Sequence, residues 1–178
     1  MNEKKISLWA VLSKTTIIHT ITYFLMGILA LNLFHYTEAF SSGVLSAYMR
    51  PTDHPMVIAG VLFQPLRGIL FGVVFYLLRD VLFARKNGWL VSWIMLVFVG
   101  ILSTFSAAPG SIEGFVYSKL GWSQFGLGMI EVIGQALLLS LLTYFWVNHP
   151  QKKWQGWVYG VFFALVLLMP VLGLLVTQ

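Results

Sequence analysis

The chain has 178 residues, of which 58% are hydrophobic, 16% aromatic and only 10% charged. Soluble globular domains carry about a quarter charged residues and just under half apolar ones, so this composition excludes that class and indicates a membrane protein. The net charge is +5. In a soluble protein such an excess of basic residues would suggest a nucleic-acid partner, but here these residues lie mostly between the apolar segments. No nucleic-acid partner is therefore predicted.

Five apolar windows are long enough to cross a bilayer, which takes about 20 residues for a hydrocarbon core of roughly 30 Å. They cover residues 15–35, 56–78, 89–108, 125–147 and 157–176. The first is too long for a signal peptide and has no small-residue cleavage site behind it, so we interpret it as a retained span. The sequence therefore predicts an all-α, polytopic helix bundle, with residues 1–178 forming a single transmembrane domain.

The cations predict the orientation of this bundle, because Lys and Arg are retained in cytoplasmic connections. Eight lie on the side of the N-terminus and two on the opposite side. The eight are Lys4, Lys5, Lys14, Arg79, Arg85, Lys86, Lys152 and Lys153, and the two are Arg50 and Lys119. We expect the N-terminus inside and the C-terminus outside, in a cell membrane of the bacterial cytoplasmic type.

Pairs of glycines four residues apart predict close helix packing. Gly68 and Gly72 lie in the second window, and Gly156 and Gly160 lie at the start of the fifth. Small residues at this spacing let two helix backbones approach. Contact within the chain is the favoured interpretation for both pairs, and dimerisation is the alternative.

Two ionisable residues, Arg67 and Glu131, lie inside the second and fourth windows. Charged side chains are costly in hydrocarbon and usually face the bundle interior or a water-filled cavity. At a rise of 1.5 Å per residue, Arg67 lies roughly 16 Å and Glu131 roughly 9 to 10 Å below the outer boundary, so we predict that they meet. They either border a pocket or form an ion pair that serves only assembly.

Other hydrogen-bonding groups fall at similar depth in the outer half of the predicted bundle. They come from four of the windows, including Asn32 and His35 at the end of the first. We therefore predict a polar pocket open toward the outside. The predicted binding residues are Gln64, Arg67, Ser103, Thr104, Glu131 and Gln135.

Pro65 interrupts the second window. A proline inside a helix removes one backbone hydrogen bond and frees a carbonyl, here that of Val61, which must find another partner. A kink is the favoured interpretation, and a broken helix that exposes backbone to a solute is the alternative.

The connection after the first window begins with apolar residues that recur every four positions. Phe40, Val44 and Tyr48 share one helical face, which predicts a short amphipathic helix on the membrane surface.

Arg50, Asp53 and His54 follow, and they form the densest group of reactive side chains outside the predicted spans. Arg50 has the chemistry to hold a phosphate or carboxylate, and Asp53 with His54 has that of a general base. Because no nucleophile motif accompanies them, a turn with Asp53 as a helix cap is favoured over an active site.

No metal or cofactor is predicted. His19 and His35 lie about 24 Å apart along one span and cannot share an ion. The absence of cysteine also excludes disulfides, thiol catalysis and cysteine-ligated zinc. His19 is expected to form a hydrogen bond within the bundle.

Three functions remain open on the sequence. The first is binding or transport of a small polar or amphiphilic solute, such as a lipid headgroup. The second is a non-catalytic accessory subunit that assembles with other membrane proteins. The third is a membrane-embedded enzyme that acts on a lipid-linked substrate, which is the least favoured. The lipid bilayer is the one partner common to all three.

Overall fold

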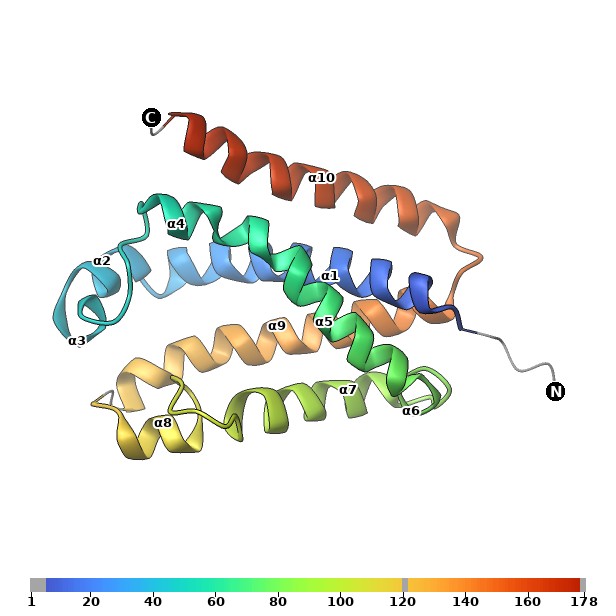
Figure 1. Ribbon diagram of the computed structural model, residues 1–178, viewed down its shortest axis with the longest axis horizontal. Helices are drawn as coiled ribbons and strands as arrows, with labels where there is room; N and C mark the ends of the chain where they lie inside the picture. The colour runs from blue at the N-terminus through green and yellow to red at the C-terminus, as the bar shows by residue number, and fades with distance from the viewer. Residues whose placement is uncertain (1–5, 120–121, 177–178) are drawn as a thin grey trace.

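Helix α1 (Leu8–Leu33) is the element on which the rest of the fold packs. The computed structural model describes residues 6–119 and 122–176. Within them α1 contacts α5 (Gln64–Leu77), α9 (Trp122–Asn148) and α10 (Lys153–Val176). Figure 1 shows α1 between α10 and α9, with α5 crossing it. Several α1 side chains are fully buried, among them Val11 and Ile18, so the core of the bundle follows this helix.

Four helical stretches of the described residues are long and apolar enough to cross a membrane. They are Leu8–Leu33, Pro55–Leu77, Gly128–Asn148 and Lys153–Leu175, and they correspond to four of the five predicted windows. The remaining window contains a shorter apolar helix, Gly88–Leu102, composed of α7 (Gly88–Val97) and a π-helical turn, η2 (Phe98–Leu102).

The predicted helix over residues 89–108 is wrong at its C-terminal end, because the chain leaves helical geometry after Leu102. The residues that follow are rich in Ser and Thr, whose hydroxyls compete with the backbone for hydrogen bonds. Gly110 then adopts a φ of +88°, which turns the chain. Ser111 accepts a hydrogen bond from the Gly114 N–H and so caps α8 (Ile112–Tyr117).

The second span changes geometry part-way along its length. It consists of α4 (Pro55–Ile58), a 3₁₀-helical segment η1 (Ala59–Phe63) and α5. Pro65 lies in the first turn of α5, where its missing N–H costs no helical hydrogen bond. The carbonyl of Val61 accepts from the Gln64 N–H instead. The interruption predicted at Pro65 is therefore a 3₁₀-to-α junction.

Two local predictions for the preceding connection need correction. The single amphipathic helix is divided into α2 (Tyr36–Ser41) and α3 (Gly43–Ser46), because Ser42 is extended with φ −139° and ψ 162°. The cap of α4 is His54, whose Nδ1 accepts from the Met56 N–H at 3.1 Å, and not Asp53. An imidazole nitrogen thus has the capping role expected of the neighbouring carboxylate.

The two glycine pairs have different surroundings. A Cβ added to Gly68 would lie 2.6 Å from the Cα of Thr16, and one added to Gly72 would lie 2.9 Å from the Cα of Leu12. The predicted close contact within the chain is confirmed there, between α5 and α1. A Cβ at Gly156 or Gly160 would meet nothing within 4 Å, so the same prediction is wrong for the pair in α10.

The elements are distributed between two ends of the bundle (Figure 1). Helices α1 and α10 both begin at the end of the bundle where α6 (Arg79–Leu82) lies, and we call it the α6 end. Helices α2, α3 and α8 and the last turns of α10 lie at the opposite end, which we call the α8 end. Of the cations used to predict the orientation, Lys4 and Lys5 lie outside the described residues.

Candidate functional site

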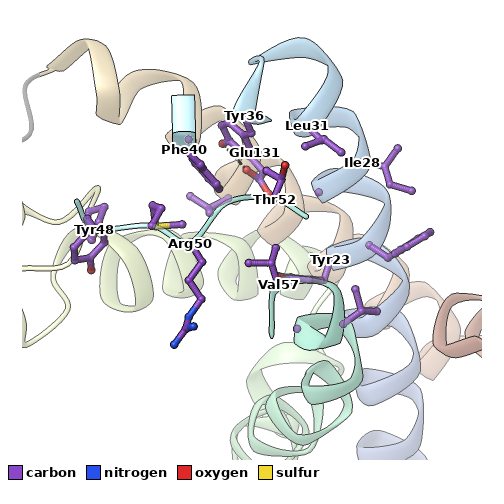
Figure 2. Close-up of a pocket in the computed structure, with 18 of the residues that line it drawn as sticks. Tyr23, Ile28, Leu31, Tyr36, Phe40, Tyr48, Arg50, Thr52, Val57 and Glu131 are labelled. Carbon is purple, nitrogen blue, oxygen red and sulfur yellow. Dashed lines mark hydrogen bonds between the residues drawn. The ribbon is translucent and has the colours of Figure 1, made fainter. Parts of the chain in front are cut away.

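A cavity of about 760 Å³ lies at the α8 end, and we call it the large cavity. Its walls come from α1, α9, the chain before α4, and the first turns of the second span (Figure 2). Most of the lining side chains are apolar, such as Phe24, Ile28, Leu31, Val57 and Val132. The polar groups are few: Tyr23, Tyr36, Tyr48, Arg50, Thr52 and Glu131.

A hydrogen bond between Tyr36 and Glu131 forms the most polar part of this lining. The Tyr36 hydroxyl donates to Oε2 of Glu131 at 2.7 Å, and the bond is partly buried (Figure 2). His35 makes this pairing possible, because its left-handed backbone, with φ +50°, turns the chain sharply between α1 and α2. Burial raises the pKa of Tyr36, and the bond to Glu131 raises it further, so Tyr36 remains a protonated donor.

Aromatic contacts fix the position of the Tyr36 ring. Phe40 stacks on it with centroids 4.8 Å apart and planes 17° apart, and Phe34 lies at 5.9 Å. On the deeper side of the cavity, Tyr23 lies within electrostatic range of both Glu131 and Arg67. Tyr23, Tyr36 and Glu131 are thus polar groups in a lining that is mostly apolar.

Arg50 lies at the rim of the large cavity. Its Nη1 is 3.1 Å from Nε2 of His54, and Figure 2 shows the guanidinium pointing away from Glu131. Asp53 and His54 do not line the cavity. Of the three reactive residues in this connection, the structure thus places Arg50 at the large cavity and leaves Asp53 and His54 outside its lining.

A second cavity, of about 140 Å³, lies nearer the middle of the bundle, and we call it the small cavity. It is bounded by α1, α5, α9 and the α7–η2 helix. Its polar lining residues are His19, Arg67 and Gln135, and its apolar ones include Phe71 and Leu139. Val132 lines both cavities, so they are neighbours along α9.

Gln64 connects two of the residues at the small cavity. Its Oε1 lies 3.2 Å from Nε2 of His19 and accepts from Nη1 of Arg67 at 3.4 Å. Its Nε2 donates to the carbonyl of Gly60 at 3.0 Å. The Phe71 ring packs edge-on against His19 at 4.9 Å, and the Arg67 guanidinium lies 6.0 Å from the same ring. The hydrogen bond expected for His19 within the bundle is confirmed.

The six predicted binding residues are divided among four places. Glu131 lines the large cavity, and Arg67 and Gln135 line the small one. Gln64 is buried between them, with 5% of its surface exposed. Ser103 and Thr104 follow η2 and line neither cavity. One polar pocket was predicted, whereas the structure divides these residues between the large cavity, the small cavity and positions outside both.

Arg67 and Glu131 do not form the predicted ion pair. Among the described residues, Glu131 has its hydrogen bond with Tyr36, whereas Arg67 has Gln64 and the Phe71 ring. An ion pair does form between Arg79 and Asp80, whose Nε and Oδ1 atoms lie 3.8 Å apart. Glu131 faces the large cavity and Arg67 faces the small one, so the two charged side chains point into different cavities.

Tyr23, Tyr36 and Tyr48 were not predicted as site residues. Tyr36 and Glu131 are 95 positions apart in the chain, and their contact depends on the left-handed turn at His35. A non-glycine residue in that conformation has no sequence signature. The sequence does place Tyr36 just after the end of an apolar span, but tyrosine is common there because its ring favours the membrane–water interface.

Comparison of the chain with protein-family models, with curated proteins and with solved structures finds no match. The function is therefore argued from the two cavities themselves.

Proposed function

We propose that this protein is a multi-pass membrane protein that binds an amphiphilic molecule in the large cavity. Small-molecule sites are concave, have volumes of roughly 300 to 1,000 Å³, and are mostly apolar with a few placed polar groups. The large cavity, at about 760 Å³, has both properties. The apolar residues of α1 would contact the body of the ligand, and the Tyr36–Glu131 pair would bind its polar part.

The chemistry of the lining favours a ligand with a hydroxyl or other uncharged polar group near its apolar body. The second oxygen of Glu131 can accept a further hydrogen bond, and the Tyr23 hydroxyl can donate or accept one. Arg50 at the rim adds a positive charge that suits a phosphate or carboxylate. Together these groups fit a lipid-like molecule whose headgroup reaches the rim.

In this proposal the large cavity faces the outside of a cell membrane. The cations Arg79, Arg85, Lys86, Lys152 and Lys153 belong to the connections at the α6 end, and such connections stay in the cytoplasm. The α8 end is then extracytoplasmic. The α7–η2 helix, together with the non-helical chain after Leu102, makes the third of five passes, with the N-terminus inside and the C-terminus outside.

The observation that carries the proposal is the size and lining of the large cavity, and two glycines allow it to be filled. A Cβ at Gly27 or Gly60 would meet nothing within 4 Å, although both residues line the cavity. Gly60→Phe is therefore expected to occupy the space and to weaken retention of a phospholipid at least about tenfold, without disturbing the packing. Gly27→Phe should have the same effect.

The measurement is native mass spectrometry of the full-length protein released from nanodiscs that contain phosphatidylglycerol. Gly156→Phe is the matched control, because Gly156 also has no atom within 4 Å of its Cβ position and lines neither cavity. Wild type and the control should retain one lipid per chain. Equal retention by Gly60→Phe and Gly156→Phe would refute the proposed site.

A further inference from the structure

The guanidinium of Arg67 lies in the middle of the second span without an acidic partner. It is at least ten residues, or about 15 Å of helix, from either end of Pro55–Leu77. That distance is too great for the side chain to reach either interface. Among the described residues its hydrogen-bond acceptor is the Gln64 amide oxygen, which is neutral. Arg67 is an exposed residue and lines the small cavity, so its charge is available to a ligand there.

His19 also lines the small cavity, and its side chain carries an unsatisfied nitrogen. The Gln64 amide is oriented by the bond from its Nε2 to Gly60, so its Oε1 can only accept. The Nε2 of His19 must then carry the proton and donate to it. The other nitrogen, Nδ1, keeps a lone pair, and it is buried without a hydrogen-bond partner in a side chain that is 1% exposed.

We propose that the small cavity binds the carboxyl group of a carboxylic acid, at a site separate from the large cavity. One oxygen would accept from Arg67, and the O–H of the other would donate to Nδ1 of His19. Both side chains line the small cavity, and Nε2 of His19 and Nη1 of Arg67 lie within 3.4 Å of the same Gln64 oxygen, which places the imidazole ring and the guanidinium side by side. A carboxyl group is the simplest one that offers an acceptor and an O–H donor side by side.

The dimensions of the cavity agree with this ligand class. A volume of about 140 Å³ is close to the roughly 150 Å³ of an engineered cavity that holds benzene, so it admits a carboxyl group with a short alkyl stem. Phe71, Leu96 and Leu139 provide the apolar lining for that stem. A phosphate would need more than one cationic side chain, and a halide would leave Nδ1 of His19 without a donor.

The test uses full-length protein in phosphatidylcholine nanodiscs, with ¹⁵N-labelled imidazoles. Butyrate is expected to shift the Nδ1 resonance of His19 saturably, whereas butyramide and chloride at matched ionic strength should not. Arg67→Gln should weaken butyrate binding at least about tenfold, since a hydrogen bond from a charged donor is lost. Arg79→Gln is the control, because Arg79 pairs with Asp80 and lines neither cavity.

A comparison of two acids of different chain length shows whether the bound acid comes from the lipid phase or from water. Tighter binding of decanoate than of butyrate would assign the acid to the lipid phase, and the reverse would assign it to water; both support a carboxyl site. An equal shift with chloride or butyramide, or no shift at all, would overturn it. If Arg67→Gln does not fold, Arg67→Lys replaces it. The comparison of butyrate with butyramide and chloride on the wild-type protein then tests the proposal. Lipid retention in the large cavity is measured separately, so either proposal can fail alone.

Discussion

Replacing Gly68 with alanine is expected to lower the free energy of unfolding by about 1 to 3 kcal/mol, the usual cost of overpacking. The added methyl group would lie 2.6 Å from the Cα of Thr16 and 3.1 Å from its carbonyl oxygen. Both are backbone atoms, so no side-chain rotation relieves the clash, and α5 must move away from α1. Adding Gly72→Ala should increase the loss, because that methyl would meet the Cα of Leu12 at 2.9 Å.

Unfolding in mixed detergent micelles measures this difference, and α10 provides the matched control. Gly160→Ala makes the same change at the same four-residue spacing, but its methyl would meet no atom within 4 Å. It should leave the stability unchanged or raise it slightly, because alanine is the better helix former. Equal losses for Gly68→Ala and Gly160→Ala would contradict the packing described for α5 on α1.

Replacing Gln64 with leucine is expected to cost about 2 to 4 kcal/mol, because it removes hydrogen bonds to a buried imidazole and to two further polar groups. Nε2 of His19 would lose its acceptor, and the Gly60 carbonyl would lose its side-chain donor. Arg67 would lose its amide oxygen as well. The leucine adds apolar volume of similar size, so the loss is mainly that of hydrogen bonding by a side chain of which only 5% is exposed.

Gln155→Leu is the control for this prediction. Gln155 is also buried, with 7% of its surface exposed, but its Oε1 has no hydrogen-bond partner. The same substitution should therefore change the free energy of unfolding by less than about 1 kcal/mol, because an unsatisfied polar atom is removed. The same mixed-micelle unfolding experiment compares the two variants, and a larger loss for Gln155→Leu than for Gln64→Leu would show that the His19–Gln64–Arg67 contacts do not stabilise the fold.

Much of the fold could be predicted because the bilayer imposes simple rules. Long apolar runs predict the four helices that can cross a membrane, and the small-residue spacing at Gly68 and Gly72 predicts a backbone contact that the structure contains. At the two glycines with the same spacing in α10, an added Cβ would meet nothing within 4 Å. Spacing alone indicates that close approach is possible, and the positions of the other helices decide whether it occurs.

The site was predicted less well because depth is only one of the coordinates that place a side chain. Counting residues along a span gives the height of Arg67 and Glu131, but it does not give the direction in which each points around its helix axis. In the structure Arg67 faces the small cavity and Glu131 faces the large one. The Tyr36 partner of Glu131 depends on one left-handed residue, His35, and no periodicity reports that conformation.

Separation of these two groups changes the chemistry that the bundle can support. A paired Arg67 and Glu131 would neutralise each other and leave little to attract a ligand. Kept apart, the carboxyl group with its tyrosine donor serves one cavity, and the unpaired guanidinium serves another. In this account the large cavity takes an amphiphile from the outside, and the small cavity takes an acid group.

The most direct test of the outward-facing cavity uses the fact that the chain contains no cysteine. A single cysteine at Gly60 would lie in the large cavity, and one at Gly160 would lie on α10 away from both cavities. We predict that a membrane-impermeant maleimide added outside intact cells labels Gly60→Cys rapidly and leaves Gly160→Cys unlabelled. If Gly60→Cys reacts only from the cytoplasmic side, or no faster than Gly160→Cys, the large cavity does not open to the outside and the proposed function is wrong.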